Sequence, residues 1–157
     1  MDTVILGAGA AGLFCAGSIL RSEGGVGRRG VVLDHAASPG EKIRISGGGR
    51  CNFTNLASTP DRFLSENPRF AASALAGFRP AEFVELVDRA GIAWHEKTLG
   101  QLFCDSSARQ IIDMLLQRMR GVELRLNTAV NGVVRREDGF VVTSSGGEIL
   151  ARQVVVA

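Results

Sequence analysis

The sequence predicts an α/β fold with a mainly parallel sheet, helices on both faces and an antiparallel β-meander before the final strand. Two short apolar runs, Val4-Ile5-Leu6 and residues 30–34, are typical of buried parallel strands, and the stretch between them has helical length. Residues 130–152 alternate between apolar and polar side chains around glycine-containing turns, which indicates antiparallel hairpins. We therefore expect both kinds of sheet in one chain.

The start of the chain predicts a βαβ unit, whose crossover is expected to be right-handed. Its helix runs from Ala10 to about Arg21, with Leu20 on the apolar stripe, and Gly24-Gly25 are expected to end it. Residues 35–60 follow the second strand directly. They are rich in Gly, Ser and Asn and lack periodicity, so we interpret them as a functional loop.

The middle of the chain predicts two amphipathic helices. One starts at Pro80 and ends at Gly91, and the other covers residues 108–120, where Ser107 and Gln110 have the spacing of a capping box. The expected later strands are residues 122–126, the meander strands 130–135, 140–143 and 148–152, and a last buried strand that begins at residue 153.

Size and charge limit the classes of protein that fit. The chain has 157 residues, 45% hydrophobic and 22% charged, which suits one globular domain. A net charge of +2 is too small to indicate a nucleic-acid or anionic-membrane partner, so we expect neither. Because the N-terminal apolar run is short and lacks a cationic segment before it, we expect a cytoplasmic protein.

Cysteine and histidine are too sparse for a disulfide framework or a metal site. Cys15, Cys51 and Cys104 are an odd number and lie far apart, and the only histidines are His35 and His95. We expect no bound metal.

The hexapeptide from Gly7 to Gly12 is a G-x-G-x-x-G motif placed after a strand and at the start of a helix. Gly7 permits a tight turn, Gly9 lets a pyrophosphate approach the backbone, and Gly12 lets helix and strand pack closely. Asp34 ends the second strand and is the expected acceptor for the adenosine ribose hydroxyls. Its charge would repel a 2′-phosphate, so the motif favours FAD or NAD over NADP.

A second motif runs from Gly40 to Asn55 with the sequence G-E-K-I-R-I-S-G-G-G-R-C-N-F-T-N. Three consecutive glycines let a flat ligand lie against bare backbone and expose several N–H donors. Lys42 and Arg50 add positive charge, and Ser46 and Asn52 add neutral hydrogen-bonding groups. This mixture suits a phosphate followed by a flat heterocycle with a polar edge.

The second motif closely resembles the signature of the BaiN/RdsA family of bacterial NAD(P)/FAD-dependent oxidoreductases, and residues 94–104 are also similar to that family. The resemblance covers the whole chain. It implies a glutathione-reductase-type, Rossmann-like FAD-binding fold. The cofactor-binding residues expected from the motifs and the resemblance are Gly7, Gly9, Ala10, Ala11, Gly12, Asp34, His35, Lys42, Ser46, Gly47, Gly48, Gly49, Arg50, Cys51, Asn52, Val130 and Ala157.

The resemblance also implies that residues 1–157 are an incomplete FAD-binding domain, without the substrate domain and the C-terminal return found in the family. The expected parent is a flavin-dependent oxidoreductase that is linked to NAD(P)H and acts on a small organic substrate. Two alternatives stay open at this point. One is an NAD-binding dehydrogenase domain, and the other is a non-catalytic nucleotide-binding fragment.

No catalytic acid or base follows from the sequence. Arg50 is a candidate for stabilising negative charge on a reduced flavin. Cys51 has no partner cysteine nearby in the sequence, so a packing role is favoured over redox chemistry. His95 and Glu96 lie on a predicted strand, where adjacent side chains point to opposite faces, so we do not expect them to act as a pair.

Overall fold

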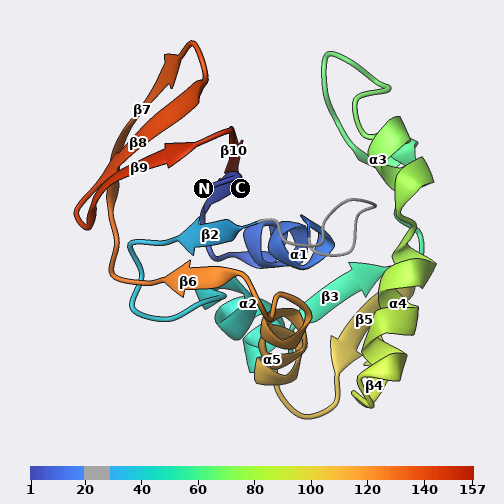
Figure 1. Cartoon of the computed structure of the whole chain (residues 1–157). Coiled ribbons are helices and arrows are strands. Elements are labelled where there is room, and N and C mark those ends of the chain that lie inside the picture. The colour runs from blue at the N-terminus through green and yellow to red at the C-terminus, as the bar shows by residue number, and fades with distance from the viewer. Residues whose placement is uncertain (20–28) are drawn as a thin grey trace. The chain divides into compact units, whose positions relative to one another are not determined.

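The computed structural model describes residues 1–19 and 29–157 (Figure 1). The expected end of the first helix, with Leu20, Arg21 and Gly24-Gly25, lies outside the described residues. The helices are α1 Ala10–Ile19, α2 Glu41–Ile45, α3 Ala72–Gly77, α4 Pro80–Arg89 and α5 Arg109–Arg118. The strands are β1 Thr3–Leu6, β2 Gly30–Leu33, β3 Asn52–Asn55, β4 Trp94–Glu96, β5 Gln101–Cys104, β6 Glu123–Arg125, β7 Val130–Arg136, β8 Gly139–Ser144, β9 Gly147–Ala151 and β10 Gln153–Val156.

The chain forms two compact units. The first unit comprises Met1–Ile43 and Ile112–Ala157, and the second comprises Arg44–Ile111. Each unit is described by itself below.

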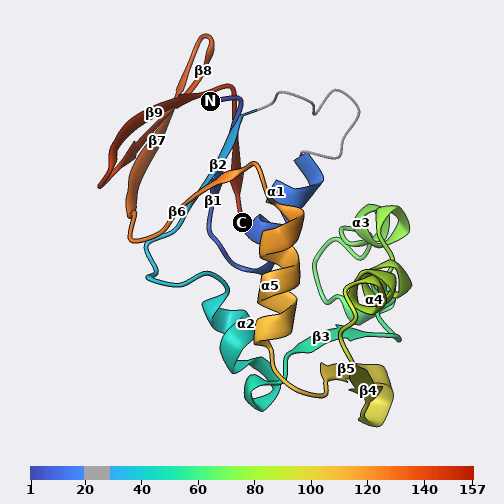
Figure 2. The ribbon, with the colours of Figure 1, turned by 60° about the horizontal axis from the view of Figure 1, so that its bottom comes forward.

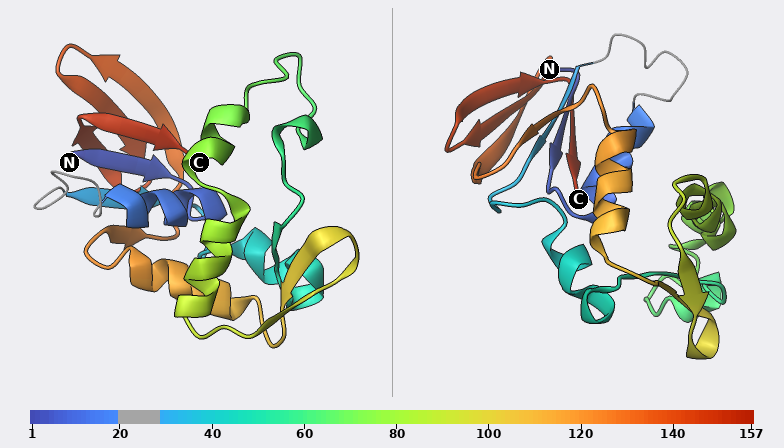
Figure 3. Two further views of the ribbon diagram at one scale, coloured as in Figure 1. Left: turned by 90° about the vertical axis from the view of Figure 1, so that its right-hand side faces the viewer. Right: turned by 90° about the horizontal axis from the view of Figure 1, so that it is seen from below.

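A four-stranded parallel sheet in the order β10-β1-β2-β6 forms the centre of the first unit. Strand β1 pairs with β10 on one side and with β2 on the other, so that Val4 lies opposite both Val154 and Val31. Figure 3 shows the final strand, in red, beside the first strand, in blue. The expected parallel strands are thus confirmed, including residues 123–125 and the last strand.

The two faces of this sheet carry different layers. On one face Val4, Val31 and Leu33 pack against Val142 and Ala151 of the antiparallel sheet β7-β8-β9. On the other face lie α1 and α5, as Figure 2 shows.

Contacts to these helices come from the opposite side of the same strands. A side chain on Gly12 of α1 would meet Ile5 of β1, and one on Gly17 would meet the Cβ of Arg118 in α5, 3.2 Å away. The α/β fold class and the meander are confirmed. The expectation of helices on both faces needs a correction, because within the described residues the meander supplies the apolar cover for the second face.

The meander follows the predicted hairpins. Strands β7 and β8 pair from Val130 with Ser144 to Arg136 with Gly139, so the turn falls at Glu137 and Asp138. Gly139 has φ 143°, and a side chain there would overlap the Ala151 carbonyl of β9. A glycine is therefore required where the hairpin returns beside the third strand.

The second unit contains an antiparallel sheet in the order β3-β5-β4. Phe53 of β3 contacts Phe83 of α4 and Trp94 of β4, with ring centroids 6.1 and 6.3 Å apart. Helix α4 begins at Pro80, as predicted. The Arg79 N–H donates to the Glu82 carboxylate at 2.7 Å, which satisfies a backbone donor at the start of the helix.

The segment 35–60, which was expected to be a loop, contains α2, a 3₁₀ turn at Ser46–Gly49 and strand β3. These elements are too short to show a hydrophobic period in the sequence. Strand β3 forms because it pairs with the distant β5, where Asn52 lies opposite Phe103. Strand β3 is therefore stabilised by residues about fifty positions later in the chain, and its own sequence does not indicate it.

Candidate cofactor-binding site

A cavity of about 590 Å³ opens at the carboxyl ends of the parallel strands of the first unit. Strands β1, β2 and β10 end at this edge, at Leu6, Leu33 and Val156. Ligands of open parallel sheets bind at this edge because the loops that follow the strands meet there. The lining residues are Leu6, Gly7, Ala8, Gly9, Ala10, Ala11, Leu33, Asp34, His35, Ala36, Ser38, Glu41, Lys42, Ile43, Thr128, Val130 and Ala157.

The three glycines of the G-x-G-x-x-G motif have different surroundings. Gly7 has φ 113°, and a side chain there would overlap the Ala157 carbonyl. A side chain on Gly12 would overlap the Gly7 carbonyl, so α1 packs directly on the turn before it. Nothing lies within 4 Å of a Cβ built on Gly9, so its backbone faces open space. The turn and packing roles of Gly7 and Gly12 follow from these contacts.

Helix α1 begins at this cavity. Ala10 and Ala11 of its first turn line the cavity, and the Leu13 N–H is the first to bond within the helix, to the Gly9 carbonyl at 3.0 Å. The preceding N–H groups and the helix dipole favour an anion at this end. Lys42 of α2 also lines the cavity and adds a positive charge.

Asp34 anchors the loops around the cavity. Its carboxylate accepts the N–H of Ala8 at 2.6 Å and the N–H of Ala36 at 2.8 Å. Its backbone carbonyl accepts the N–H of Thr128 at 2.8 Å. Asp34 therefore ties the glycine loop to the segments after β2 and β6. Its contact with a ribose stays a prediction, as do the cofactor contacts of the other expected site residues.

Three polar residues of the cavity were missed by sequence reasoning, namely Ser38, Glu41 and Thr128. Thr128 follows β6, and its hydroxyl donates to the Leu126 carbonyl at 3.0 Å. Its position after a parallel strand could have indicated it, because the loops after all parallel strands meet at the edge of the sheet where ligands bind. His35 lines the cavity as expected, and its Nδ1 lies 3.4 Å from the Asp34 carboxylate.

The expected residues Ser46 to Asn52 belong to the second unit. Ser46–Gly49 form a short turn with left-handed backbone at its glycines, and Asn52 begins β3. Gly47, Gly48 and Gly49 have φ values of 58°, 66° and 85°. Residues with side chains rarely adopt this backbone conformation, which explains why three consecutive glycines occur here. Gly47 and Gly48 are exposed, and so are Arg50 and Asn52.

Hydrogen bonds hold this turn against β5 and the segment before α5. The Cys104 N–H donates to the Arg50 carbonyl at 2.9 Å, and the Ala108 N–H donates to the Gly49 carbonyl at 2.7 Å. Within the turn, the Cys51 N–H donates to the Ser46 carbonyl at 3.0 Å. Three backbone hydrogen bonds therefore fix the position of the exposed glycine backbone.

The two thiols beside this turn are buried. Burial raises the pKa of Cys51, and burial together with the nearby Cys51 raises the pKa of Cys104 to about 11. A buried thiol with a raised pKa forms little thiolate and is a poor nucleophile. These surroundings favour the packing role for Cys51 over redox chemistry.

A histidine–carboxylate pair was not expected from the sequence. His95 Nδ1 lies 2.6 Å from Asp105 Oδ1, and both side chains are partly exposed. His95 is on β4, and Asp105 follows β5, so the pair forms across the β4–β5 hairpin. His95 therefore pairs with Asp105 and not with its neighbour Glu96, which lies on the opposite side of the strand.

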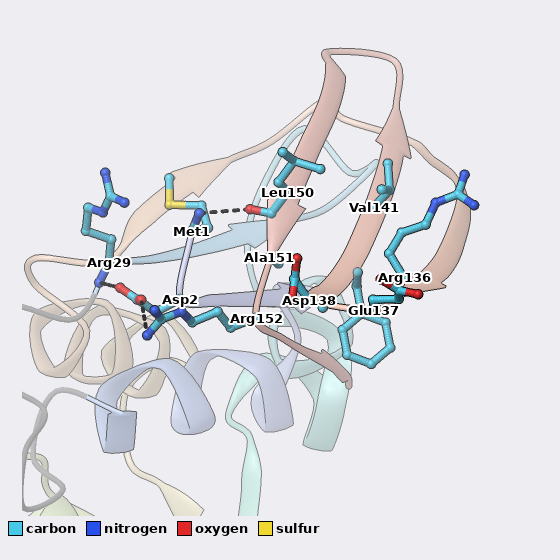
Figure 4. Close-up of a pocket in the computed structure, with 12 residues that line it drawn as sticks. Met1, Asp2, Arg29, Arg136, Glu137, Asp138, Val141, Leu150, Ala151 and Arg152 are labelled. Carbon is cyan, nitrogen blue, oxygen red and sulfur yellow. Dashed lines mark hydrogen bonds and ion pairs between the residues drawn. The ribbon is translucent and has the colours of Figure 1, made fainter.

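A larger hollow of about 750 Å³ lies between the N-terminus and the meander (Figure 4). Some of its polar groups are bonded to one another. The Met1 amine donates to the Leu150 carbonyl at 2.8 Å, and Asp2 accepts the Arg29 N–H and lies 3.9 Å from the Arg152 guanidinium. The Arg29 hydrogen bond is the main reason that the pKa of Asp2 is lowered. None of the expected site residues lines this hollow.

Residues 1–19 and 29–157 contain no cluster of three metal-ligating His, Cys, Asp or Glu side chains. None of the helices in these ranges has the length and apolar character needed to cross a bilayer.

The parallel sheet, the glycine turn and the cavity at its carboxyl edge define a Rossmann-like nucleotide-binding domain. The chain belongs to the family described as the HI0933-like protein Rossmann domain, which matches residues 1–157. The resemblance drawn from the sequence is confirmed to this level.

Three curated proteins from bacteria are similar to the chain. The chain is 49% identical, over 99% of its length, to a protein of Escherichia coli named ribosomal RNA dihydrouridine synthase. It is 41% identical, again over 99%, to a protein of the same name from Haemophilus influenzae. A 3-dehydro-bile acid delta(4,6)-reductase of Clostridium scindens is 28% identical over 98% of the chain. The chain spans 38%, 39% and 37% of these relatives, respectively.

Solved structures share the fold at low identity. Glycine oxidase from Geobacillus kaustophilus matches 99% of the chain, with 54% of that protein covered, at a TM-score of 0.62 and 16% identity. L-proline dehydrogenase from P. horikoshii matches 99% of the chain, with 22% of that protein covered, at a TM-score of 0.56 and 16% identity.

Proposed function

We propose that this chain is the FAD-binding part of a flavin-dependent oxidoreductase. The observation that carries the proposal is the cavity at the carboxyl edge of the sheet, where the open backbone of Gly9 and the start of α1 meet. That combination suits a pyrophosphate. We assign Asp34 and Val130, which line the same cavity, to the adenosine end.

The residues present fit FAD in chemical terms. The cavity of the first unit has an apolar lining with a few polar groups, and Lys42 supplies a cation beside the phosphate end. In the second unit, the bare backbone of Gly47 to Gly49 offers a surface for a flat ring, with the exposed Arg50 directly after the turn and the exposed Asn52 at the start of β3. We assign this turn to the isoalloxazine.

The reaction class follows from the names of the relatives. Uridine becomes dihydrouridine by reduction of the C5–C6 double bond, which is conjugated to the C4 carbonyl. A 3-dehydro delta(4,6) steroid likewise has double bonds conjugated to a carbonyl at C3. Both names thus describe hydride addition to a carbon–carbon double bond that a carbonyl activates. We propose this reaction for the parent of the chain.

For the substrate we propose a uridine of ribosomal RNA, because the two relatives with 49% and 41% identity carry that name. This proposal differs from two expectations of the sequence analysis: the small organic substrate that the resemblance implied, and the absence of a nucleic-acid partner that the low net charge suggested. The modest net charge of +2 does not oppose it, since the chain spans about two fifths of those relatives and the remaining parts are free to contact RNA.

NAD(P)H is the proposed electron donor, and the bacterial cytoplasm the proposed location. We also propose that the parent contains a substrate domain and a return of the FAD domain beyond these residues, in keeping with the greater length of the relatives. The alternatives are an NAD-binding dehydrogenase domain and a non-catalytic nucleotide-binding fragment.

The visible absorption spectrum of the purified protein tests the proposal. FAD is added, excess FAD is removed, and retained flavin bands support the FAD assignment. A folded parent protein that retains NAD and no flavin would favour the dehydrogenase alternative. Flavin that is retained but, once reduced, is not reoxidised by any substrate with a conjugated double bond would favour the non-catalytic one.

A further inference from the structure

We infer that the His95–Asp105 pair is the proton donor of the proposed reduction, with His95 as the acid and Asp105 as its positioning residue. The inference rests on the proposed function. It is carried by three features of the second unit: the geometry of the pair, its position beside the glycine turn, and the unsuitability of the thiols and the guanidinium next to that turn.

The geometry of the pair defines which ring nitrogen is available. Asp105 Oδ1 lies 2.6 Å from His95 Nδ1. An ionised carboxylate only accepts hydrogen bonds, so Nδ1–H donates to it and Nε2 remains to carry the transferable proton. Among the residues that the structure describes, no hydrogen bond involves Nε2. With 38% of the His95 side chain exposed, this nitrogen is accessible to a substrate.

The imidazole is held in place by its neighbours. His95 lies opposite Phe103 in the β4–β5 pairing, and the two rings are stacked with centroids 6.3 Å apart and planes inclined by 19°. The Lys97 ammonium lies 4.1 Å from the centre of the Phe103 ring. A carboxylate on one side and an aromatic face on the other fix the ring orientation, as a proton donor requires.

Phe103 also connects the pair to the glycine turn. A Cβ built on Gly47 would lie 2.6 Å from Cε1 of Phe103, so the turn rests on the same ring on which His95 stacks. The turn is the segment that we assign to the isoalloxazine. A substrate lying on that ring system would therefore be near His95.

The chemistry requires a group of this kind. When bound, reduced FAD supplies the hydride to the carbon β to the carbonyl. The α-carbon must then receive a proton, which His95 Nε2–H donates, leaving a neutral imidazole that takes a proton from water. NAD(P)H restores the reduced cofactor. Two hydrogens are thus added to the double bond, and charge is balanced.

Other candidates near the turn are less suitable. Cys51 and Cys104 are buried, with 5% and 0% of their surface exposed, so neither thiol reaches a bound substrate. Arg50 is exposed, but a guanidinium does not release its proton in proteins. The second histidine, His35, lies at the cavity of the first unit, which we assign to the adenosine end.

The test compares three variants of the full-length parent: His95→Gln, Asp105→Asn and, as a matched control on the other side of β4, Glu96→Gln. Each is reduced anaerobically with NAD(P)H and mixed with unmodified ribosomal RNA transcribed in vitro. We expect H95Q to slow flavin reoxidation by RNA at least 100-fold and D105N about 10-fold. Flavin content and the rate of reduction by NAD(P)H should stay within about twofold of wild type in all three.

A second readout needs no cofactor. In ¹⁵N NMR spectra of this chain, neutral His95 should carry its proton on Nδ1, and D105N should shift the population to Nε2–H. If the flavin of H95Q is reoxidised by RNA at the wild-type rate, while the wild-type protein turns over, the inference is overturned and the proposed function stands. Wild-type protein that holds no flavin would instead overturn the proposed function, and the inference with it.

Discussion

Gly12 packs directly against the carbonyl group of Gly7, and a side chain on Gly12 would overlap that oxygen. Gly9, between them in the motif, has open space on the corresponding side. Identical glycines of one short motif therefore serve different purposes. Gly12 serves the packing of α1 on the turn, and Gly9 serves whatever binds in the cavity.

This difference predicts opposite outcomes for two alanine substitutions. Gly12→Ala should lower the free energy of unfolding by about 1–3 kcal/mol or more, because the new methyl group has to displace backbone. Gly9→Ala should leave stability nearly unchanged and weaken FAD binding. Urea unfolding followed by FAD titration of both variants separates the effects. Equal losses of stability would contradict the assignment.

A similar comparison tests the turn of the second unit. Gly47 and Gly48 both have positive φ, but only Gly47 lies against the Phe103 ring. Gly48→Ala should cost about 1–2 kcal/mol of stability from backbone strain alone. Gly47→Ala should cost more, because the strain is joined by a clash. Thermal unfolding of the two variants measures the difference. Equal stability of the two variants would show that the Phe103 ring moves aside at no cost and would contradict this prediction.

Removing the carboxylate of Asp34 should loosen the first unit as well as the ribose site. Asp34→Ala leaves the N–H groups of Ala8 and Ala36 without their acceptor, which costs about 1–3 kcal/mol for each group that stays buried. Asp34→Asn keeps one carbonyl oxygen and should lose less. Chemical denaturation and hydrogen exchange at Ala8 and Ala36 report the change. Unaltered exchange in the alanine variant would exclude an anchoring role.

The raised pKa values of the buried thiols predict slow alkylation. With a pKa of about 11, Cys104 is thiolate in roughly one molecule per thousand at pH 8. The native protein should therefore react slowly with iodoacetamide at Cys104, and urea should make it reactive. Mass spectrometry of quenched samples locates the modified residues. Fast labelling of native Cys104 at pH 8 would contradict its burial.

The same shift makes stability depend on pH in the alkaline range. The folded protein holds the Cys104 proton more tightly than the unfolded chain does, because the pKa is raised from an ordinary value of 9.0 to about 11. The contribution of the buried thiol is complete below pH 9 and is lost as the pH rises towards 11. Thermal unfolding of wild type and Cys104→Ala across this range isolates the effect, which should be smaller in the variant.

The predictable part of this protein is the part that local sequence controls. The G-x-G-x-x-G turn, the strands on either side of α1 and the hairpin at Glu137 and Asp138 were all predictable, because glycine requirements and apolar runs act within a few residues. The pairing of Asn52 with Phe103 and of His95 with Asp105 was not. Neither pair is marked by a local pattern.

The sequence by itself determined the fold class and the nucleotide-binding edge of the parallel sheet, since short apolar strands and the glycine turn leave few other arrangements. Only the tertiary structure decided that the meander covers the second face, through Val142 and Ala151, and that Phe103 lies against both Gly47 and His95. Except for the contact between His95 and Phe103 of neighbouring strands, these contacts join residues far apart in the chain. Their formation depends on how strands pair and layers pack, which hydrophobic periodicity does not specify.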